Sequence, residues 1–313
     1  MKTILLTGAS GFIGRHIIPF LIDRGYEVHA VYYAHPPEFE FIQNKNLILH
    51  RCNLLDFEEQ KKLLSEIKPT HLLHFAWYTV HKEYWTSFEN IKWVQASLNL
   101  FLNFVQNGGR RALVAGTCAE YDWNYGFFSE GITPTNPKTL YGVCKDSLHR
   151  ILSHFCKQAN ISFAWGRIFF VYGPYENPQR LIPYVITSLL EDKPAFCGHG
   201  NQIRDFLYVE DAASAFVSLL ESEVQGPINI ASGQPISLKT IIYKIADFLD
   251  KRYLINLGTV STSDDDVPFL VADVRRLKNE VRWEPKITID EGLNISIEWW
   301  KKKIKESKIK IKE

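Results

Sequence analysis

A tyrosine and a lysine, Tyr141 and Lys145, stand four residues apart, and this spacing places both on one face of a helix. A phenol beside an ammonium group can exchange a proton with an oxygen whose carbon gains or loses a hydride. The cation favours this role because it lowers the phenol pKa from its usual value of about 10. Thr117 adds a hydroxyl that can hydrogen-bond the same oxygen. We therefore expect Thr117, Tyr141 and Lys145 to be catalytic residues for redox chemistry on an alcohol or ketone.

A glycine-rich turn near the start of the chain gives this pair its context. Gly8 allows a tight turn, Gly11 lets the backbone approach a pyrophosphate, and Gly14 lets a helix pack closely on a strand. The N-terminus of that helix would present free N–H groups to the phosphates. The turn therefore predicts a dinucleotide site, with Tyr141 and Lys145 near the nicotinamide ribose. The expected cofactor contacts from the turn are Gly8, Gly11, Phe12, Ile13, Gly14 and Arg15.

The end of the second strand bears on which dinucleotide binds. It reads Tyr32-Tyr33, and no carboxylate follows until Glu38. A missing carboxylate removes the hydrogen bond to a free ribose 2′-hydroxyl and the repulsion against a 2′-phosphate. Arg15 and His35 are available as phosphate partners. We therefore expect NADP(H), with NAD(H) as the alternative.

Strands and helices alternate through the first half of the chain. Apolar runs predict strands, and amphipathic stretches between them predict helices; this alternation is typical of an α/β fold with a Rossmann-type doubly wound parallel sheet. After residue 170 proline and glycine recur and the alternation becomes irregular. We expect a dinucleotide-binding domain over residues 1–170 and a smaller C-terminal substrate-binding lobe over 171–313. The chain is expected to return to the main sheet within 205–230, at 206–209 and 228–230. The predicted strands are 4–7, 27–33, 47–52, 71–75 and 112–115, and the helices are 12–24, 56–67 and 88–106.

Composition excludes several other classes of protein. The 313 residues carry a formal net charge of +1, so no overall field favours nucleic acid or membrane surfaces. No apolar run reaches the roughly 18 residues of a membrane span. Five scattered cysteines form no metal-binding or disulfide pattern, which favours a reducing, cytoplasmic setting and no metal site. The residues after Met1 and Lys2 read as a strand rather than a leader.

Several segments together resemble a known family. With the turn, Thr117 and the Tyr141–Lys145 pair, the chain is similar to the extended short-chain dehydrogenase/reductases that act on nucleotide sugars, the NAD-dependent epimerase/dehydratase family. The resemblance implies a nucleotide-sugar substrate, Asn53 against the adenine, and Arg204 on the substrate diphosphate. A structural ion pair of Arg204 with a neighbouring aspartate is the alternative. It also implies a homodimer, paired through the helices at 88–106 and 141–157. The segments that carry it are 52–56, 74–76, 167–174, 198–211, 229–233 and 271–273.

The chain also departs from the family pattern. In members that eliminate water, an aspartate and a glutamate follow the catalytic threonine, whereas this chain has Cys118 and Ala119. Glu120 comes one position late and is expected to face the other side of an extended segment, so elimination is not expected. Cys118 is expected at the substrate, where it either takes part in catalysis or fills space. The aromatic segment 76–85 either shapes a sugar pocket or packs as a loop. Phe170 stands where many relatives have asparagine, and acidic residues 264–266 stand near the position of a missing late arginine.

These features predict an NAD(P)-dependent oxidoreductase that acts on a nucleotide-activated sugar. The leading hypothesis is reduction of an NDP-4-keto-6-deoxysugar with Tyr141 as proton donor. The alternative is a nucleotide-sugar 4-epimerase with retained NAD, which needs the same catalytic residues. A third hypothesis is a protein that binds a dinucleotide without catalysis.

Overall fold

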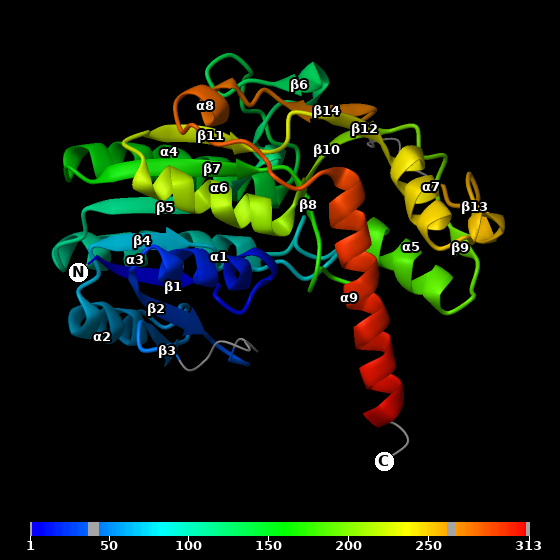
Figure 1. The fold of residues 1–313 in the computed structure, drawn as a ribbon. Coiled ribbons are helices and arrows are strands. Elements are labelled where there is room, and N and C mark those ends of the chain that lie inside the picture. Colours follow the sequence, from blue (N-terminus) through cyan, green and yellow to red (C-terminus); the bar gives the residue numbers. More distant parts are fainter. Residues whose placement is uncertain (1, 37–43, 262–266, 311–313) are drawn as a thin grey trace.

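A seven-stranded parallel sheet forms the centre of the molecule (Figure 1). The computed structural model describes residues 2–36, 44–261 and 267–310. The strand order is β11-β7-β5-β4-β1-β2-β3, so the chain reverses direction across the sheet between β1 and β4. The predicted Rossmann-type sheet is confirmed. Its strands are β1 (Thr3–Thr7), β2 (Glu27–Tyr32), β3 (Leu47–Arg51), β4 (His71–His74), β5 (Arg111–Thr117), β7 (Ser162–Ile168) and β11 (Gly226–Ile230).

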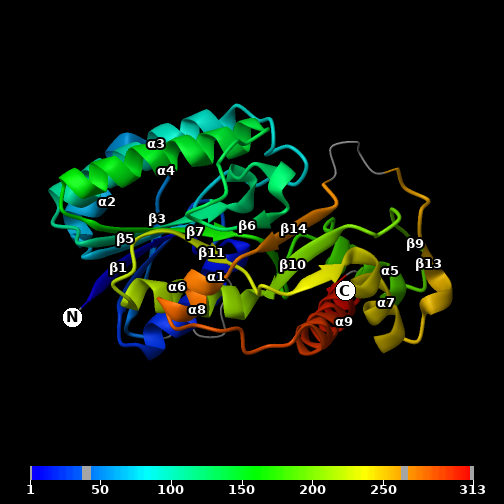
Figure 2. The same cartoon turned by 90° about the horizontal axis from the view of Figure 1, so that it is seen from above.

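Helices cover both faces of this sheet (Figure 2). Alternate residues of β1 divide between two cores, because successive side chains of a strand point to opposite faces. Ile4 and Leu6 belong to one core and Leu5 to the other. Asp56, at the start of the predicted helix 56–67, is its N-cap and accepts hydrogen bonds from the N–H groups of Glu58 and Glu59. One face carries α2 (Phe57–Ile67), α3 (Glu89–Gln106) and α4 (Leu140–Gln158), and the other carries α1 (Phe12–Asp23) and α6 (Val209–Glu221).

A smaller sheet and a group of helices form the lobe. The division predicted at residue 170 falls where β7 ends and β8 begins. The small sheet has the order β12-β10-β14-β6, with β8 beside β10, and β9 pairs with β13. Its strands are β6 (Phe127–Phe128), β8 (Phe170–Tyr172), β10 (Ile203–Tyr208), β12 (Pro235–Ser237) and β14 (Phe269–Ala272), beside β9 (Ala195–Phe196) and β13 (Ile255–Asn256). The lobe helices are α5 (Leu181–Leu190), α7 (Leu238–Phe248) and α9 (Ile289–Lys310), and α8 (Arg275–Asn279) lies beside β11.

One predicted strand lies in a different sheet. Residues 206–208 were expected in the main sheet, but β10 pairs with β8 in the small one, with Phe206 opposite Phe170. Among the described residues after 170, α6 and β11 return to the large domain, and α8 packs beside β11. The aromatic rings of β8 and β10 pack on one another, at a centroid distance of 5.7 Å for Phe170 and Phe206. An apolar run predicts a buried strand but does not say which sheet receives it.

None of the helices within the described residues is long and apolar enough to cross a membrane.

Candidate active site

A cavity of 1040 Å³ opens at the carboxyl ends of the main-sheet strands, below the lobe. In doubly wound sheets this switch point is where ligands bind, and the volume is at the upper end for small-molecule sites. Both the glycine turn and the catalytic residues predicted from the sequence line it. The main-domain lining includes Gly8, Gly11, Gly14, Tyr32, Asn53, Trp77, Tyr84, Thr117, Cys118, Tyr141 and Lys145, and the lobe contributes Phe170, Glu176, Asn177, Arg180 and Arg204.

The glycine turn is closed too tightly for larger residues. Gly8 has φ +69°, and a Cβ there would lie 2.7 Å from the Ala76 nitrogen. A Cβ on Gly14 would lie 2.1 Å from the Gly8 carbonyl oxygen, so the first turn of α1 rests directly on the loop. Phe12 and Ile13 line the cavity at the start of α1. The main chain is therefore exposed to a ligand at a helix N-terminus, which suits the pyrophosphate of a dinucleotide.

The residues considered for the adenosine end of the cofactor occupy different places. Tyr32, Tyr33 and Asn53 line the cavity. Arg15 is not among the lining residues; its guanidinium lies over the Tyr175 ring, 4.0 Å from the centroid, and donates to the Ser10 carbonyl at 2.7 Å. This places the Arg15 side chain against Tyr175 of the lobe. His35 is exposed at the end of the described segment, and Glu38 falls outside the described residues.

Thr117, Tyr141 and Lys145 meet at one point of the cavity. Thr117 is the last residue of β5, and Tyr141 and Lys145 lie one turn apart near the start of α4, which Thr139 caps through the Gly142 N–H. The Thr117 and Tyr141 hydroxyls are hydrogen-bonded. The chain therefore holds a hydroxyl, a phenol and an amine around a site where one substrate oxygen can bind.

The electrostatics of this group differ from the expectation. Burial raises the Tyr141 pKa above its usual value, although the hydrogen bond from Thr117 opposes the rise. Lys145 does not lower it: its ammonium donates to the Ala115 carbonyl at 2.9 Å and lies 3.7 Å from the Trp77 ring centroid. Burial lowers the pKa of Lys145 itself to about 7, opposed by Glu120. In this arrangement Tyr141 stays protonated at neutral pH and is ready to donate.

The residues after Thr117 are those at which the chain differs from relatives that eliminate water. They form a 3-10 helix, η1 (Cys118–Glu120), rather than the expected extended segment. Cys118 and Ala119 line the cavity, whereas Glu120 points away from it. Burial raises the Cys118 pKa to about 12, so this thiol is protonated at neutral pH. The segment offers no acid or base to the substrate.

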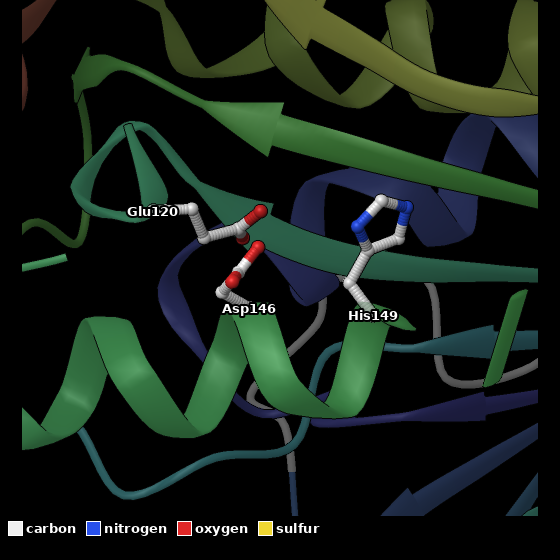
Figure 3. A group of neighbouring side chains, drawn as sticks. All are labelled: Glu120, Asp146 and His149. Carbon is white, nitrogen blue, oxygen red and sulfur yellow. The ribbon is translucent and has the colours of Figure 1, made fainter. Parts of the chain in front are cut away.

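Glu120 instead joins a buried polar cluster behind the site (Figure 3). It accepts from the Thr117 N–H at 2.8 Å and pairs with Arg167 at 2.7 Å. Asp146 and His149 of α4 complete the cluster, whose donor atoms lie within 4.8 Å of one another. Three such groups can hold a metal ion. Here, however, each carboxylate already pairs with a guanidinium group, Glu120 with Arg167 and Asp146 with Arg150. We interpret the cluster as the support that fixes Thr117.

Arg204 reaches the cavity from β10. Its guanidinium lies 5.5 Å from the Phe170 ring centroid and donates to the Ile203 carbonyl. The two aspartates considered as ion-pair partners of Arg204, Asp205 and Asp211, accept hydrogen bonds from the main chain. Asp205 accepts from the Ser232 and Gly233 N–H groups, and Asp211 accepts from those of residues 286 and 287. Acidic residues 264–266 fall outside the described residues.

Sequence reasoning missed part of the lining. Glu176, Asn177 and Arg180 come from the loop between β8 and α5, where the sequence shows only turn residues. The aromatic segment 76–85 contributes Trp77, Tyr84 and other residues to the cavity wall, so it shapes the pocket. Its sequence carried the signal, because an aromatic cluster after a predicted strand of a doubly wound sheet lies at the ligand edge.

Comparison with known proteins gives the family. A family model described as "NAD dependent epimerase/dehydratase family" matches residues 4–231. The UDP-glucuronate 4-epimerase of Thermodesulfobacterium geofontis (strain OPF15) is 26% identical over 97% of this chain and 98% of its own. The dTDP-4-dehydro-6-deoxyglucose reductase of Escherichia coli is 25% identical over 93% of this chain and 95% of its own. The solved structure of MoeE5 in complex with UDP-glucuronic acid and NAD has a TM-score of 0.84 and 27% identity, covering 97% of this chain and 100% of that one. With a matched segment that exceeds half of the chain, the protein belongs to the NAD-dependent epimerase/dehydratase family of extended short-chain dehydrogenase/reductases and is an enzyme.

Proposed function

We propose that the protein is an NAD(P)H-dependent oxidoreductase that reduces the C4 keto group of an NDP-4-keto-6-deoxysugar, with Tyr141 as proton donor. The observation that carries this proposal is the buried Tyr141 phenol, hydrogen-bonded to Thr117 and with its pKa raised. A reductase needs a protonated acid at the moment when hydride reaches the carbonyl carbon. The relative named as a dTDP-4-dehydro-6-deoxyglucose reductase supports the substrate class.

The roles of the chain's own residues follow from their places. The reduced nicotinamide, when bound, supplies the hydride. Tyr141 donates a proton to the carbonyl oxygen as the C–O double bond becomes a single bond, and Thr117 hydrogen-bonds the same oxygen. Lys145 positions the nicotinamide ribose, and its ammonium sits between the Ala115 carbonyl and the Trp77 ring. Cys118 contacts the sugar as a neutral thiol, and Arg204 binds the diphosphate with its guanidinium.

The cradle formed by the turn fits a dinucleotide, because a side chain at Gly8 or Gly14 would fill it. We further propose that NADPH is preferred to NADH. The support is the absence of a carboxylate where β2 ends at Tyr32, within the described segment up to residue 36. The ratio of kcat/KM values for the two cofactors tests this preference. A value that favours NADH contradicts it.

The second candidate is a nucleotide-sugar 4-epimerase with retained NAD, which the relative named as a UDP-glucuronate 4-epimerase favours. Epimerisation begins with removal of a proton from a hydroxyl, so its tyrosine must first act as a base. The raised pKa of Tyr141 opposes that first step. For this reason we place the epimerase second.

We also propose that the protein is a cytoplasmic homodimer paired through α3 and α4. Five cysteines are free, which suits a reducing compartment. Ile91 and Leu102 on α3, and Val143 and Ile151 on α4, are exposed apolar side chains. Pairing these stripes would remove them from water. Sedimentation velocity tests the dimer, and a monomer at micromolar concentration contradicts it.

The test of the reaction uses purified protein, a 4-keto-6-deoxy nucleotide sugar with each of several nucleotides, and NADPH or NADH. We expect loss of the reduced-nicotinamide absorbance that depends on both the sugar and the enzyme. Release of tightly bound NAD from the purified protein, with conversion of UDP-hexoses and no consumption of added cofactor, would support the epimerase instead.

A further inference from the structure

Glu176 lines the cavity and carries one carboxyl oxygen that no described residue hydrogen-bonds. The side chain is 6% exposed and lines the cavity from the loop between β8 and α5. Its Oε2 atom is buried and makes no hydrogen bond within the described part of the chain. A buried polar atom left unpaired destabilises a fold. Groups of this kind that persist in a native structure therefore call for a function.

The backbone that holds Glu176 is strained. The preceding residue, Tyr175, has φ +68°, a left-handed conformation that is rare for a bulky side chain. Its ring is held by Arg15 of α1, 4.0 Å from the ring centroid, and by Trp299 of α9 at a centroid distance of 4.8 Å. Strained residues of this kind concentrate at ligand sites. These two contacts hold Tyr175 in place, and the side chain of the next residue, Glu176, lines the cavity.

Glu176 lies on the lobe side of the cavity, and a short series of contacts connects it to the catalytic tyrosine. Arg180, at the start of α5, acts on Glu176 through its charge and hydrogen-bonds the Tyr84 phenol. The Tyr84 ring in turn packs edge-on against the Tyr141 ring at a centroid distance of 5.0 Å. Both Arg180 and Tyr84 line the cavity. Glu176, Arg180 and Tyr84 thus line the same cavity as Tyr141, in which a sugar would sit.

The charges around Glu176 leave its proton in place at neutral pH. Burial raises the pKa of Glu176 to about 8, and the charge of Arg180 and a main-chain hydrogen bond from Gly173 only partly oppose this rise. From α1, His16 contacts the Pro174 carbonyl at 3.3 Å, and burial lowers its pKa to about 4, so it is neutral. Arg15 of the same helix is engaged with Tyr175 and the Ser10 carbonyl. His81, beside Arg180, also has its pKa lowered by burial.

We propose that Glu176 is a substrate-binding residue whose carboxyl group hydrogen-bonds a hydroxyl of an uncharged sugar ring in the nucleotide-sugar substrate. This inference rests on the proposed function only in taking a nucleotide sugar as the ligand. A neutral carboxyl offers a donor and an acceptor, which matches the two sides of a hydroxyl. The proton stays on the carboxyl through the reaction, so no covalent step involves it.

The test compares Glu176→Gln and Glu176→Leu with the wild type. Glu130→Gln is the matched control, because Glu130 is equally buried but accepts from the Asn229 N–H and does not line the cavity. We measure KM for the sugar, KM for NADPH and the melting temperature. One lost hydrogen bond corresponds to a roughly threefold to tenfold rise in KM. Glu176→Leu should raise the sugar KM by that factor at unchanged NADPH KM, without lowering the melting temperature.

The pH dependence of the sugar KM distinguishes a hydrogen bond between Glu176 and the sugar from a role of Glu176 in packing alone. Ionisation of Glu176 removes its donor and adds a charge, so the wild-type sugar KM should rise between about pH 7 and about pH 9. Glu176→Gln cannot ionise, and its KM should lack the part of this rise that comes from Glu176. Glu130→Gln should keep the wild-type profile. An unchanged sugar KM in Glu176→Leu, or a rise in the NADPH KM instead, would overturn the inference.

Failure of the reductase proposal is recognised separately. Four tryptophans that line the cavity, Trp77, Trp85, Trp93 and Trp123, allow the binding of a nucleotide sugar to be followed by fluorescence without turnover. If the wild type binds a nucleotide sugar but does not reduce it, the Kd values of the Glu176 variants still decide the inference. A weaker Kd in Glu176→Leu supports it, and an unchanged Kd rejects it.

Discussion

At the scale of single residues, the chemistry depends on which groups are shielded from water. Tyr141 and Lys145 have the spacing expected of a catalytic pair, but Lys145 faces the Ala115 carbonyl and the Trp77 ring. Burial therefore controls both pKa values, raising that of Tyr141 and lowering that of Lys145. The Tyr141 phenol therefore keeps its proton at neutral pH, as the proposed reduction requires.

Replacing the phenol with a phenyl ring tests its role. Tyr141→Phe removes the proton donor and keeps the ring contacts with Tyr84 and Trp85. We expect kcat to fall about a hundred- to ten-thousand-fold, the usual contribution of a positioned acid, with cofactor binding retained. Tyr26→Phe is the control, because the Tyr26 hydroxyl is also buried but has no hydrogen-bond partner within the described residues. Retention of full activity in Tyr141→Phe would contradict the assignment.

The buried lysine predicts a pH dependence of stability. The folded state lowers the Lys145 pKa to about 7, so between about pH 7 and about pH 10 the unfolded chain binds more protons. The penalty for burying the ammonium is fully present below about pH 7 and fades as pH rises. In urea unfolding without cofactor, the free energy of unfolding of Lys145→Met should exceed that of the wild type most at low pH. This difference should shrink toward alkaline pH. Lys301→Met, at an exposed site on α9, should show no such trend. A difference independent of pH would refute this.

How far the sequence predicts the site depends on how local each residue's role is. Thr117, Tyr141 and Gly8 lie at element ends whose position follows from the alternation of strands and helices. Glu176 could not be predicted, because its place depends on the contacts of Tyr175 with two helices remote in the chain. Arg15 was assigned to the cofactor from its neighbourhood in sequence, but its side chain lies over Tyr175. Side-chain direction at a loop is set by tertiary packing.

At the scale of elements, the turn between β1 and α1 has no room for a side chain at Gly14. Gly14→Ala would place a Cβ 2.1 Å from the Gly8 carbonyl oxygen, which forces the helix away from the turn. We expect the dinucleotide Kd, measured by calorimetry, to weaken at least tenfold, with a lower melting temperature. Gly131→Ala is the control, because a Cβ at Gly131 meets open space and its backbone is unstrained. Unchanged dinucleotide affinity in Gly14→Ala would show that the turn does not hold the cofactor.

The 3-10 helix after β5 is held by a buried ion pair. Glu120 accepts from Thr117 and Trp165 and pairs with Arg167, which is 3% exposed. Glu120→Ala leaves this guanidinium buried without its partner and should lower the free energy of unfolding by about 3–5 kcal/mol. Glu280→Ala removes an exposed partner of Arg276 and should cost about 1 kcal/mol or less. Chemical denaturation of both variants provides the comparison. Equal losses would contradict the structural role of Glu120.

The elements themselves were largely predictable. The predicted strands and helices of the first half agree with β1 to β5 and α1 to α3 within a few residues, because hydrophobic periodicity and the Asp56 N-cap are local signals. The segment after Thr117 was expected to be extended and is helical, although Glu120 faces away from the cavity as expected. The strand β10 was placed in the wrong sheet, since pairing partners are set by contacts distant in sequence.

At the scale of the whole molecule, function depends on two parts meeting over one cavity. The main domain supplies the turn and the proposed catalytic residues, and the lobe supplies Glu176, Arg180 and Arg204. The fold class follows from the alternation of strands and helices in the sequence. The position of the lobe residues over the sheet could not be predicted from the sequence, because the lobe is built from short strands of irregular spacing.

The most direct test of the central claim follows the hydride itself. The enzyme is incubated with a 4-keto-6-deoxy nucleotide sugar and a nicotinamide cofactor that carries deuterium at the transferred position, and the product is analysed by mass spectrometry and NMR. The reductase account predicts one deuterium at C4 of the product sugar for each cofactor oxidised, and loss of this transfer in Tyr141→Phe. Conversion of a nucleotide sugar at C4 with neither deuterium incorporation nor oxidation of the added cofactor would contradict it.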